Sequence, residues 1–348
     1  MDSLEKVAFR YTRRFGLEFE VNSFDKRDFK ADPLGRNFNN YGLPQREEPK
    51  GIHEIADVVS QVVDEHVVIS VWTNNHYNTG WIVKPDASCG IEICSPQFKG
   101  PQGVRKVCRL ADALDADDRI EADERCSVHI HVDVADCSDD EVASIVAWWV
   151  KCEPVLLDAM PLSRKRNRYC QPLGISGFFE HDTELDSADI INQAGRMKYF
   201  TMNTFHLKRG NRRTVEFRIA DREACTNSYF LKNWVKLIVH FVECAIARGK
   251  PIGYRPHVSW SSLLWLDPVQ VFQFLKFDCE LSAGMTQTRD WFLTRLQSNV
   301  ECGLPGLFSP LGRSISAQQI DDLLSQCDPN LTLKSDHSDL VYSSIYKD

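Results

Sequence analysis

The sequence predicts an α+β fold, in which a mainly antiparallel sheet carries helices on one face and is followed by a helical C-terminal part. Three observations lead to this prediction. Short runs between residues 13 and 219 alternate apolar and polar side chains, which is typical of strands. Segments with apolar residues at helical spacing lie between these runs. From about residue 255 onward, only helical spacing remains.

The elements follow from alternation, spacing and capping. The first strand is predicted over residues 13–23, because Leu17, Phe19 and Val21 alternate with two glutamates. A capping box at Ser138 and Glu141 predicts the start of a helix that continues to about Leu157. Polar segments at 24–50 and 161–185 are predicted as loops. Further strands are predicted at 67–73, 81–86, 90–96, 126–134, 199–207 and 214–219, and further helices at 52–63, 102–115, 227–248, 268–277, 286–299 and 316–326.

The overall charge argues against nucleic-acid binding, because the chain of 348 residues has a net charge of −8 and no long Lys/Arg run. Two short basic stretches, Arg164–Arg168 and Lys208–Arg213, suit the phosphate groups of a nucleotide better. The twelve cysteines form no CxxC pair, and the sequence shows neither an apolar signal core nor a run of about 18 apolar residues. We therefore expect reduced cysteines, a cytoplasmic location and no membrane partner, with a disulfide-bonded protein as the weaker alternative.

Glu18 and Glu20 are the most informative residues of the first strand. Successive side chains of a strand point to opposite faces, so the two carboxylates share one face about 7 Å apart. Strands rarely favour glutamate, and the two charges repel each other. Taken alone, the pair suits a solvated strand face. The other interpretation is that a hard divalent cation lies between the carboxylates.

Three further predicted strand regions carry acids, histidines or an arginine at alternating positions. Each pattern alone also suits a turn residue, an exposed histidine or a simple ion pair. Together they predict one sheet with an apolar face under helices and a concave face for divalent ions. Carboxylates with an imidazole favour Mg²⁺ or Mn²⁺ over Zn²⁺, since no thiolate lies in these motifs. The residues are Asp86 and Glu92, His129 and His131, and Glu216 and Arg218.

The order of these motifs resembles the amidoligase family of the carboxylate–amine ligase superfamily, which includes glutamine synthetase and γ-glutamylcysteine synthetase. The resemblance covers about residues 13–240 and implies a curved, glutamine-synthetase-like sheet. It suggests a catalytic domain at 1–250 and a helical extension at 251–348 packed on it. The segments that carry the resemblance are Gly16–Glu20, Pro85–Ser88, Glu92–Pro96, Ser127–His131, Ser163–Tyr169, Tyr199–Asn203 and Val215–Arg218.

The resemblance also implies roles for single residues. Glu20, Asp86 and Glu92 match positions that hold the metal nearest the substrate carboxylate, although many relatives carry Glu where Asp86 stands. The metal on the nucleotide phosphates would be held by Glu18, His129 and Glu216. Positions near the ATP phosphates are matched by His131 and Arg218, and candidates for further phosphate or substrate contacts are Arg164 and Arg168. The residues expected to take part in catalysis are Arg218, Glu20 and Glu92.

The implied reaction is ATP-dependent amide formation through an acyl phosphate, with two Mg²⁺ or Mn²⁺ ions in the site. The substrates are one carboxylate and one amine, on small molecules or peptides; the sequence does not identify them, the general base or the oligomeric state. Three alternatives stay open: a kinase on a related sheet, a non-catalytic binding or assembly protein, and a hydrolase that uses His129 and His131. Cys94 and Cys170 could be nucleophiles, but buried cysteines without a motif are more often part of a core.

Overall fold

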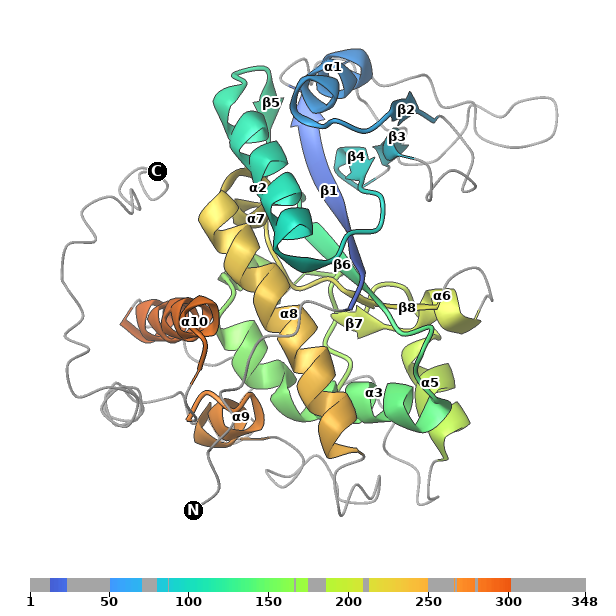
Figure 1. The fold of residues 1–348 in the computed structure, drawn as a ribbon, viewed down its shortest axis with the longest axis vertical. Helices are drawn as coiled ribbons and strands as arrows, with labels where there is room; N and C mark the ends of the chain where they lie inside the picture. Colours follow the sequence, from blue (N-terminus) through green and yellow to red (C-terminus); the bar gives the residue numbers. More distant parts are fainter. Residues whose placement is uncertain are drawn as a thin grey trace.

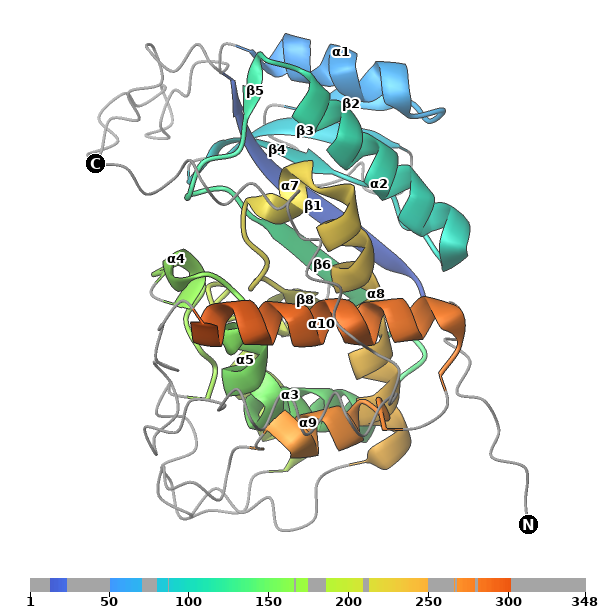
Figure 2. The ribbon, with the colours of Figure 1, turned by 90° about the vertical axis from the view of Figure 1, so that its left-hand side faces the viewer.

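One open sheet combined with helices forms the fold, as Figures 1 and 2 show. The computed structural model describes residues 13–23, 51–70, 80–86, 88–165, 167–174, 186–208, 213–249, 266, 268–278 and 281–301. The predicted combination of a sheet with helices is confirmed. The predicted loop at 24–50 and the predicted helix at 316–326 lie outside the described residues.

The sheet has the strand order β2-β3-β4-β1-β6-β8-β7, and β5 pairs with one end of β1. Strands β2 and β3 are parallel, whereas the other pairings between the described strands are antiparallel. The curved, glutamine-synthetase-like form of this sheet stays a prediction. The strands are β1 (Phe15–Ser23), β2 (Val67–Ile69), β3 (Trp81–Asp86), β4 (Gly90–Cys94), β5 (Ile120–Glu121), β6 (Val128–Asp133), β7 (Met202–Asn203) and β8 (Thr214–Phe217).

Helices cover the apolar face of the sheet. Leu17, Phe19 and Val21 of β1 are buried, and α7 contacts β1 while α8 contacts β6. Figure 2 shows α2, α7 and α8 in front of β1 and β6. The opposite face is therefore the one that presents the polar residues of these strands. The helices are α1 (Ile52–Val62), α2 (Gly100–Ala116), α3 (Asp139–Asp158), α4 (Leu162–Lys165), α5 (Ser187–Ala194), α6 (Phe205–Lys208), α7 (Glu223–Thr226), α8 (Ser228–Arg248), α9 (Pro268–Phe274) and α10 (Ala283–Glu301).

Helix α3 begins at the predicted capping box. The Ser138 side chain accepts a hydrogen bond from the Glu141 backbone N–H, and Glu141 accepts one from the Ser138 backbone N–H. Further along α3, the Trp149 ring packs edge-on against Phe217 of β8 and Phe241 of α8, with ring centroids 4.9 and 5.4 Å away. Trp149 thereby joins two helices to the edge of the sheet that carries β8.

The C-terminal helices pack on α3 and α8. Phe274 of α9 stacks on Trp148 of α3, with ring centroids 4.6 Å apart. In α10, the Thr288 hydroxyl donates a hydrogen bond to the Asn233 side chain of α8, and Trp291 packs against Phe230. The predicted helices at 268–277 and 286–299 are thus found, with α10 starting earlier, whereas the division into two domains near residue 250 stays a prediction.

The structure corrects the predicted strand at 199–207. Only Met202–Asn203 forms a strand, and the helix α6 follows directly. The reason is local, because the side-chain oxygen of Asn203 accepts a hydrogen bond from the Phe205 N–H and so turns the chain out of the sheet. A smaller correction lies at 161–185, which was predicted as a loop but contains α4. Among the described helices, none combines the length and the apolar composition of a membrane-spanning segment.

A buried carboxylate follows β8. Asp221 is 8% exposed, and its Oδ1 atom has no hydrogen-bond partner among the described residues. Burial, with a further contribution from Glu223, raises the pKa of Asp221 to about 6, although Arg295 and Arg164 oppose the shift. A raised pKa means that the folded protein binds this proton more tightly than the unfolded chain does. The stability linked to Asp221 is therefore present below about pH 4 and is lost as the pH rises through about 6.

We expect Asp221→Asn to stabilise the protein at pH 8 by about 1–3 kcal/mol, because the amide imitates the protonated acid without a buried charge. The gain should vanish at about pH 4, where the native carboxyl already carries its proton. Urea unfolding at both pH values measures the difference. Asp118→Asn, at an exposed position, is the matched control. A gain of equal size at both pH values would contradict the explanation.

Candidate active site

The register of the central strands brings the predicted polar residues together. Glu18 of β1 lies opposite His129 of β6, and His131 of β6 lies opposite Glu216 of β8. On the other side of β1, Glu20 lies opposite Glu92 of β4. Cross-strand neighbours have Cβ atoms about 5 Å apart, so these side chains meet on the polar face.

Glu18, His129 and Glu216 form the first cluster, which we call the Glu18 cluster. Each offers one ligand atom, and these atoms lie within 4.8 Å of one another. The His129 Nδ1 atom is 3.3 Å from Glu18 Oε2 and 3.6 Å from Glu216 Oε1. Glu216 and His129 are buried, whereas the Glu18 side chain is 14% exposed. The three residues for which the family resemblance implies one shared metal therefore lie together in the structure.

Both carboxylates of the Glu18 cluster are held in the ionised form. Burial opposes the charge of Glu18, but the His131 and His129 imidazoles outweigh it and keep the pKa of Glu18 well below its usual value. Burial also opposes the charge of Glu216, but Arg218 and the two histidines lower the pKa of Glu216 to about 2. Ionised carboxylates are the form that binds a metal ion.

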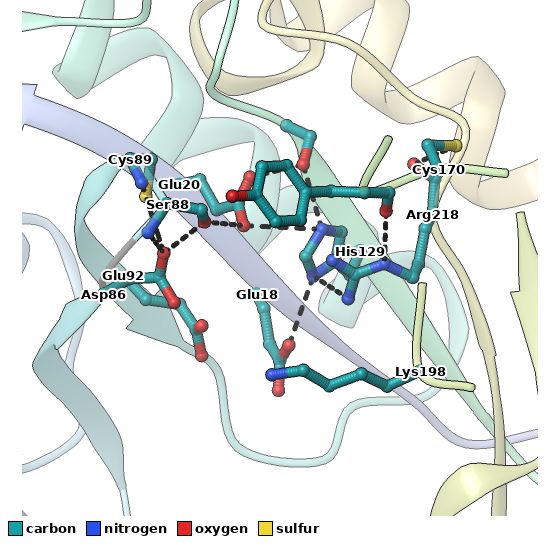
Figure 3. A network of polar contacts seen from close by, with 12 residues as sticks. Glu18, Glu20, Asp86, Ser88, Cys89, Glu92, His129, Cys170, Lys198 and Arg218 are labelled. Atoms are coloured by element: carbon teal, nitrogen blue, oxygen red, sulfur yellow. Dashed lines mark hydrogen bonds and ion pairs between the residues drawn. The ribbon is translucent and has the colours of Figure 1, made fainter. Parts of the chain in front are cut away.

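Glu20 lies in a second cluster with Asp86 and Cys89, in which the ligand atoms are again within 4.8 Å of one another. The Ser127 hydroxyl donates a hydrogen bond to Glu20 Oε2, and the Ser88 Oγ atom lies 3.5 Å from Glu20 Oε1. His129 links this cluster to the first one, because its Nε2 atom lies 3.6 Å from Glu20 Oε1. Figure 3 shows His129 among Glu18, Glu20 and Arg218.

Asp86 closes the turn between β3 and β4. Its Oδ1 atom accepts hydrogen bonds from the Ser88 hydroxyl and from the backbone N–H groups of Ser88 and Cys89, the latter two at 2.7 and 3.2 Å. Burial opposes the charge of Asp86, but these hydrogen bonds lower its pKa. Gly90 completes the turn with φ of 124°, a conformation that glycine adopts without strain. Asp86 thus has a structural task in the turn as well as a place beside Glu20.

Glu92 lies opposite Glu20 in the register, and its carboxylate also forms a cluster with Glu18 and Cys94. Its Oε1 atom is 2.7 Å from the Lys84 ammonium and 2.9 Å from the Cys94 sulfur. Burial, with Glu18, raises the pKa of Glu92, whereas Lys84 opposes the shift. Lys84 was not predicted, although it shares a face of β3 with Asp86 by the same alternation.

The predicted cations differ in their placement. The Arg218 guanidinium donates to Glu216 and lies 3.1 Å from His129 Nδ1, in the middle of the site. Arg164 is buried and donates to the backbone carbonyl of Arg218, so it supports the strand end rather than facing the clusters. Arg168 is exposed, and its guanidinium lies over the Tyr169 ring at 4.7 Å.

Three further residues, which the sequence patterns did not single out, also lie at the site. Asn203 Nδ2 donates to Glu216 Oε2 at 3.1 Å, and the Lys198 ammonium points toward Glu18 in Figure 3. His206 of α6 lies beside His131, with ring centroids 5.3 Å apart. Asn203 ends the segment 199–203 that carried part of the resemblance, whereas His206 follows it and Lys198 immediately precedes it. Lys198 precedes the predicted strand at 199–207, and His206 lies in the part of that segment that forms α6 instead.

A known protein family matches the part of the chain that contains this site. Residues 11–242 match the family described as "Putative amidoligase enzyme". This chain belongs to the amidoligase family. The matched segment contains both clusters and all the predicted site residues, and it ends within α8.

Solved structures give a weaker comparison. One similar structure is a bifunctional glutathione synthetase from Pasteurella multocida, with 11% sequence identity and a TM-score of 0.38. The alignment covers 91% of this chain and 51% of the synthetase, so the amidoligase chain spans about half its length. A match at this score does not establish a shared fold. A search of curated proteins found no match.

The donor atoms of the clusters fit divalent cations of the magnesium class. Carboxylate oxygens from β1, β4 and β8 face one another with one imidazole between them, and such oxygen-rich sets suit Mg²⁺ and Mn²⁺. Cations near these carboxylates include Arg218, which pairs with Glu216, and Lys84, which pairs with Glu92. Buried carboxylates gathered this closely are costly without positive charge between them, so bound cations would relieve the repulsion.

Proposed function

We propose that this amidoligase is an ATP-dependent carboxylate–amine ligase that forms an amide, peptide or isopeptide bond through an acyl phosphate. The observation that supports the proposal is the position of His129. Its two ring nitrogens face different carboxylate groups, Glu18 and Glu216 on one side and Glu20 on the other. Two neighbouring sets of hard ligands are what an enzyme needs to hold a triphosphate and a second anionic substrate.

Each set has a proposed task. Glu18, His129 and Glu216 would hold the ion on the nucleotide phosphates. Glu20, with Asp86 and Glu92 nearby, would hold the ion beside the substrate carboxylate. Such ions would neutralise phosphate charge and orient the two reactants. His131 and Arg218 would contact the ATP phosphates, with Arg168 as a further cation at the exposed rim.

The reaction then has two steps. A substrate carboxylate oxygen attacks the γ-phosphorus of ATP, the bond from the γ-phosphorus to the β,γ-bridging oxygen breaks, and ADP leaves. The amine nitrogen next attacks the acyl carbon, loses a proton, and expels phosphate. The first step is needed because a carboxylate is a poor electrophile. Arg218, held between Glu216 and His129, would stabilise charge on the transferring phosphoryl group.

The proposal extends to the rest of the chain. Residues 1–250 would form the catalytic domain and 251–348 a helical extension on it, in line with the packing of α9 and α10 on α3 and α8. The substrates would be small molecules or peptides.

The test is a screen of amine and carboxylate pairs for ATP consumption with Mg²⁺. We expect at least one pair for which wild type releases ADP and phosphate together with an amide, and for which Glu20→Gln is inactive. Mass spectrometry of the products separates the possibilities. A phosphorylated product without an amide would indicate a kinase. Equal ATP consumption by wild type and Glu20→Gln with every pair would contradict the ligase proposal.

A further inference from the structure

A third group of candidate ligands lies at the β8 side of the Glu18 cluster and shares Glu216 with it. Only His206 of this group has no task in the proposed reaction. His131, His206 and Glu216 each offer one ligand atom, and these atoms lie within 4.8 Å of one another. The residues come from β6, α6 and β8 respectively. Two imidazoles and one carboxylate form a softer set than the oxygen-rich clusters, and imidazole ligands suit zinc-class metals.

The two oxygens of Glu216 face different neighbours. Oε1 lies toward Arg218 and toward His129, 3.6 Å from its Nδ1 atom. Oε2 lies 3.9 Å from His206 Nε2 and accepts a hydrogen bond from Asn203 Nδ2 at 3.1 Å. A carboxylate oxygen has two acceptor sites, so Oε2 can keep the Asn203 hydrogen bond and still bind an ion. One carboxylate can therefore bridge two neighbouring ions, as in two-metal sites.

Neighbouring side chains orient two of the three ligands. The Thr214 hydroxyl lies 3.5 Å from His131 Nδ1, and Asn203 holds Glu216. Such supporting contacts are typical of histidine and carboxylate ligands. His206 has more freedom, because its side chain is 26% exposed and α6 is only four residues long. Tetrahedral zinc needs ligand atoms roughly 3.3 Å apart, so a movement of His206 by about 0.5–1.5 Å would complete the set.

We propose that His131, His206 and Glu216 bind a transition-metal ion of the zinc class, such as Zn²⁺ or Co²⁺, next to the Glu18 cluster. Three protein ligands leave a fourth position for water or a phosphate oxygen. This proposal goes beyond the ligase reaction and does not depend on that reaction. It concerns the metal ion that these residues bind, whereas the proposed function concerns the substrates that the enzyme converts.

The experiment is a titration of the full chain with Co²⁺ in excess Mg²⁺, followed by visible absorption. We expect wild type to bind one Co²⁺ ion tightly and His206→Asn to bind it at least about tenfold more weakly. His53→Asn is the matched control, because His53 is exposed on α1, which packs beside β2 and β3. Glu20→Gln should also keep the Co²⁺ affinity, which separates this site from the proposed magnesium sites.

Three outcomes would overturn the proposal: no Co²⁺ binding by wild type in excess Mg²⁺, equal affinity in wild type and His206→Asn, or loss of affinity in Glu20→Gln with retention in His206→Asn. A second measurement covers the case in which His206→Asn does not fold. Side-chain NMR of wild type, labelled with ¹⁵N in histidine, should show the His131 and His206 rings shifting with Zn²⁺ while His53 does not. Unchanged His131 and His206 signals would equally overturn it.

Discussion

Glu20→Gln is expected to abolish amide formation while ATP still binds, whereas Glu18→Gln is expected mainly to weaken ATP binding. The two carboxylates are two residues apart on β1 and share one face, yet their surroundings differ. Glu18 belongs with His129 and Glu216, while Glu20 lies against Ser127, Ser88 and Asp86. Glutamine keeps the shape of each side chain and removes its charge, so any difference reports the electrostatic role of each position.

Two measurements separate the variants. Calorimetry with a non-hydrolysable ATP analogue and Mg²⁺ gives nucleotide affinity, and product formation with the substrate pair found by the screen gives the rate. Removing one group that stabilises the transferring charge costs about 10²–10³ in rate, and we expect at least this for Glu20→Gln. Glu124→Gln, at an exposed turn position, is the control. Equal losses of nucleotide affinity in both variants would contradict the division of tasks.

Strand alternation explains why much of the site could be predicted. Alternation places Glu18 with Glu20, His129 with His131, and Glu216 with Arg218 on one face each, and the observed register then brings these faces together. The apolar residues of each strand show which face packs against the helices, so the polar residues can be assigned to the opposite face without knowing the neighbouring strands. The sequence alone could not order the strands, so it could not show that the Glu92 carboxylate also lies beside Lys84 and Cys94.

Residues outside strands were harder to predict because no periodicity constrains them. The basic run at 164–168 suggested phosphate contacts, but Arg164 lies next to α3 and donates to the backbone of Arg218. The segment after Asn203 has the composition of a strand, and a single side-chain hydrogen bond turns it into α6. His206 therefore reaches Glu216 from a helix that alternation could not predict.

A second large effect is expected from Glu153, a buried acid of α3 that lies outside the clusters. Its carboxylate accepts hydrogen bonds from the backbone N–H groups of Leu173 and Gly174, at 2.7 and 2.8 Å. It also accepts hydrogen bonds from the Thr201 hydroxyl and the Trp149 indole. A leucine in this position would take this acceptor away from the two backbone N–H groups and the Thr201 hydroxyl, and each unsatisfied buried group costs about 1–3 kcal/mol. The Trp149 indole would keep the Thr201 oxygen as an acceptor, at 3.0 Å.

Glu153→Leu should therefore lower the free energy of unfolding by at least about 3 kcal/mol in urea at neutral pH. Glu54→Leu, at an exposed position of α1, is the matched control and should change stability by less than about 1 kcal/mol. Burial raises the pKa of Glu153 despite the four hydrogen bonds. The ionised carboxylate is therefore less stable in the folded protein than in water, and this cost is removed in the leucine variant. A loss below that of the control would show that the donors find other acceptors.

The effect of Glu153→Leu should extend to the site through the segment 167–174. Glu153 fixes one end of this segment at Leu173 and Gly174, and the carbonyl of Tyr169 within it accepts a hydrogen bond from Arg218 Nε at 3.4 Å. Releasing the segment removes one of the contacts that orient the Arg218 guanidinium. We therefore expect ligase activity to fall in the folded fraction of the variant as well. Full specific activity per folded molecule would show instead that Glu216 and His129 alone orient Arg218.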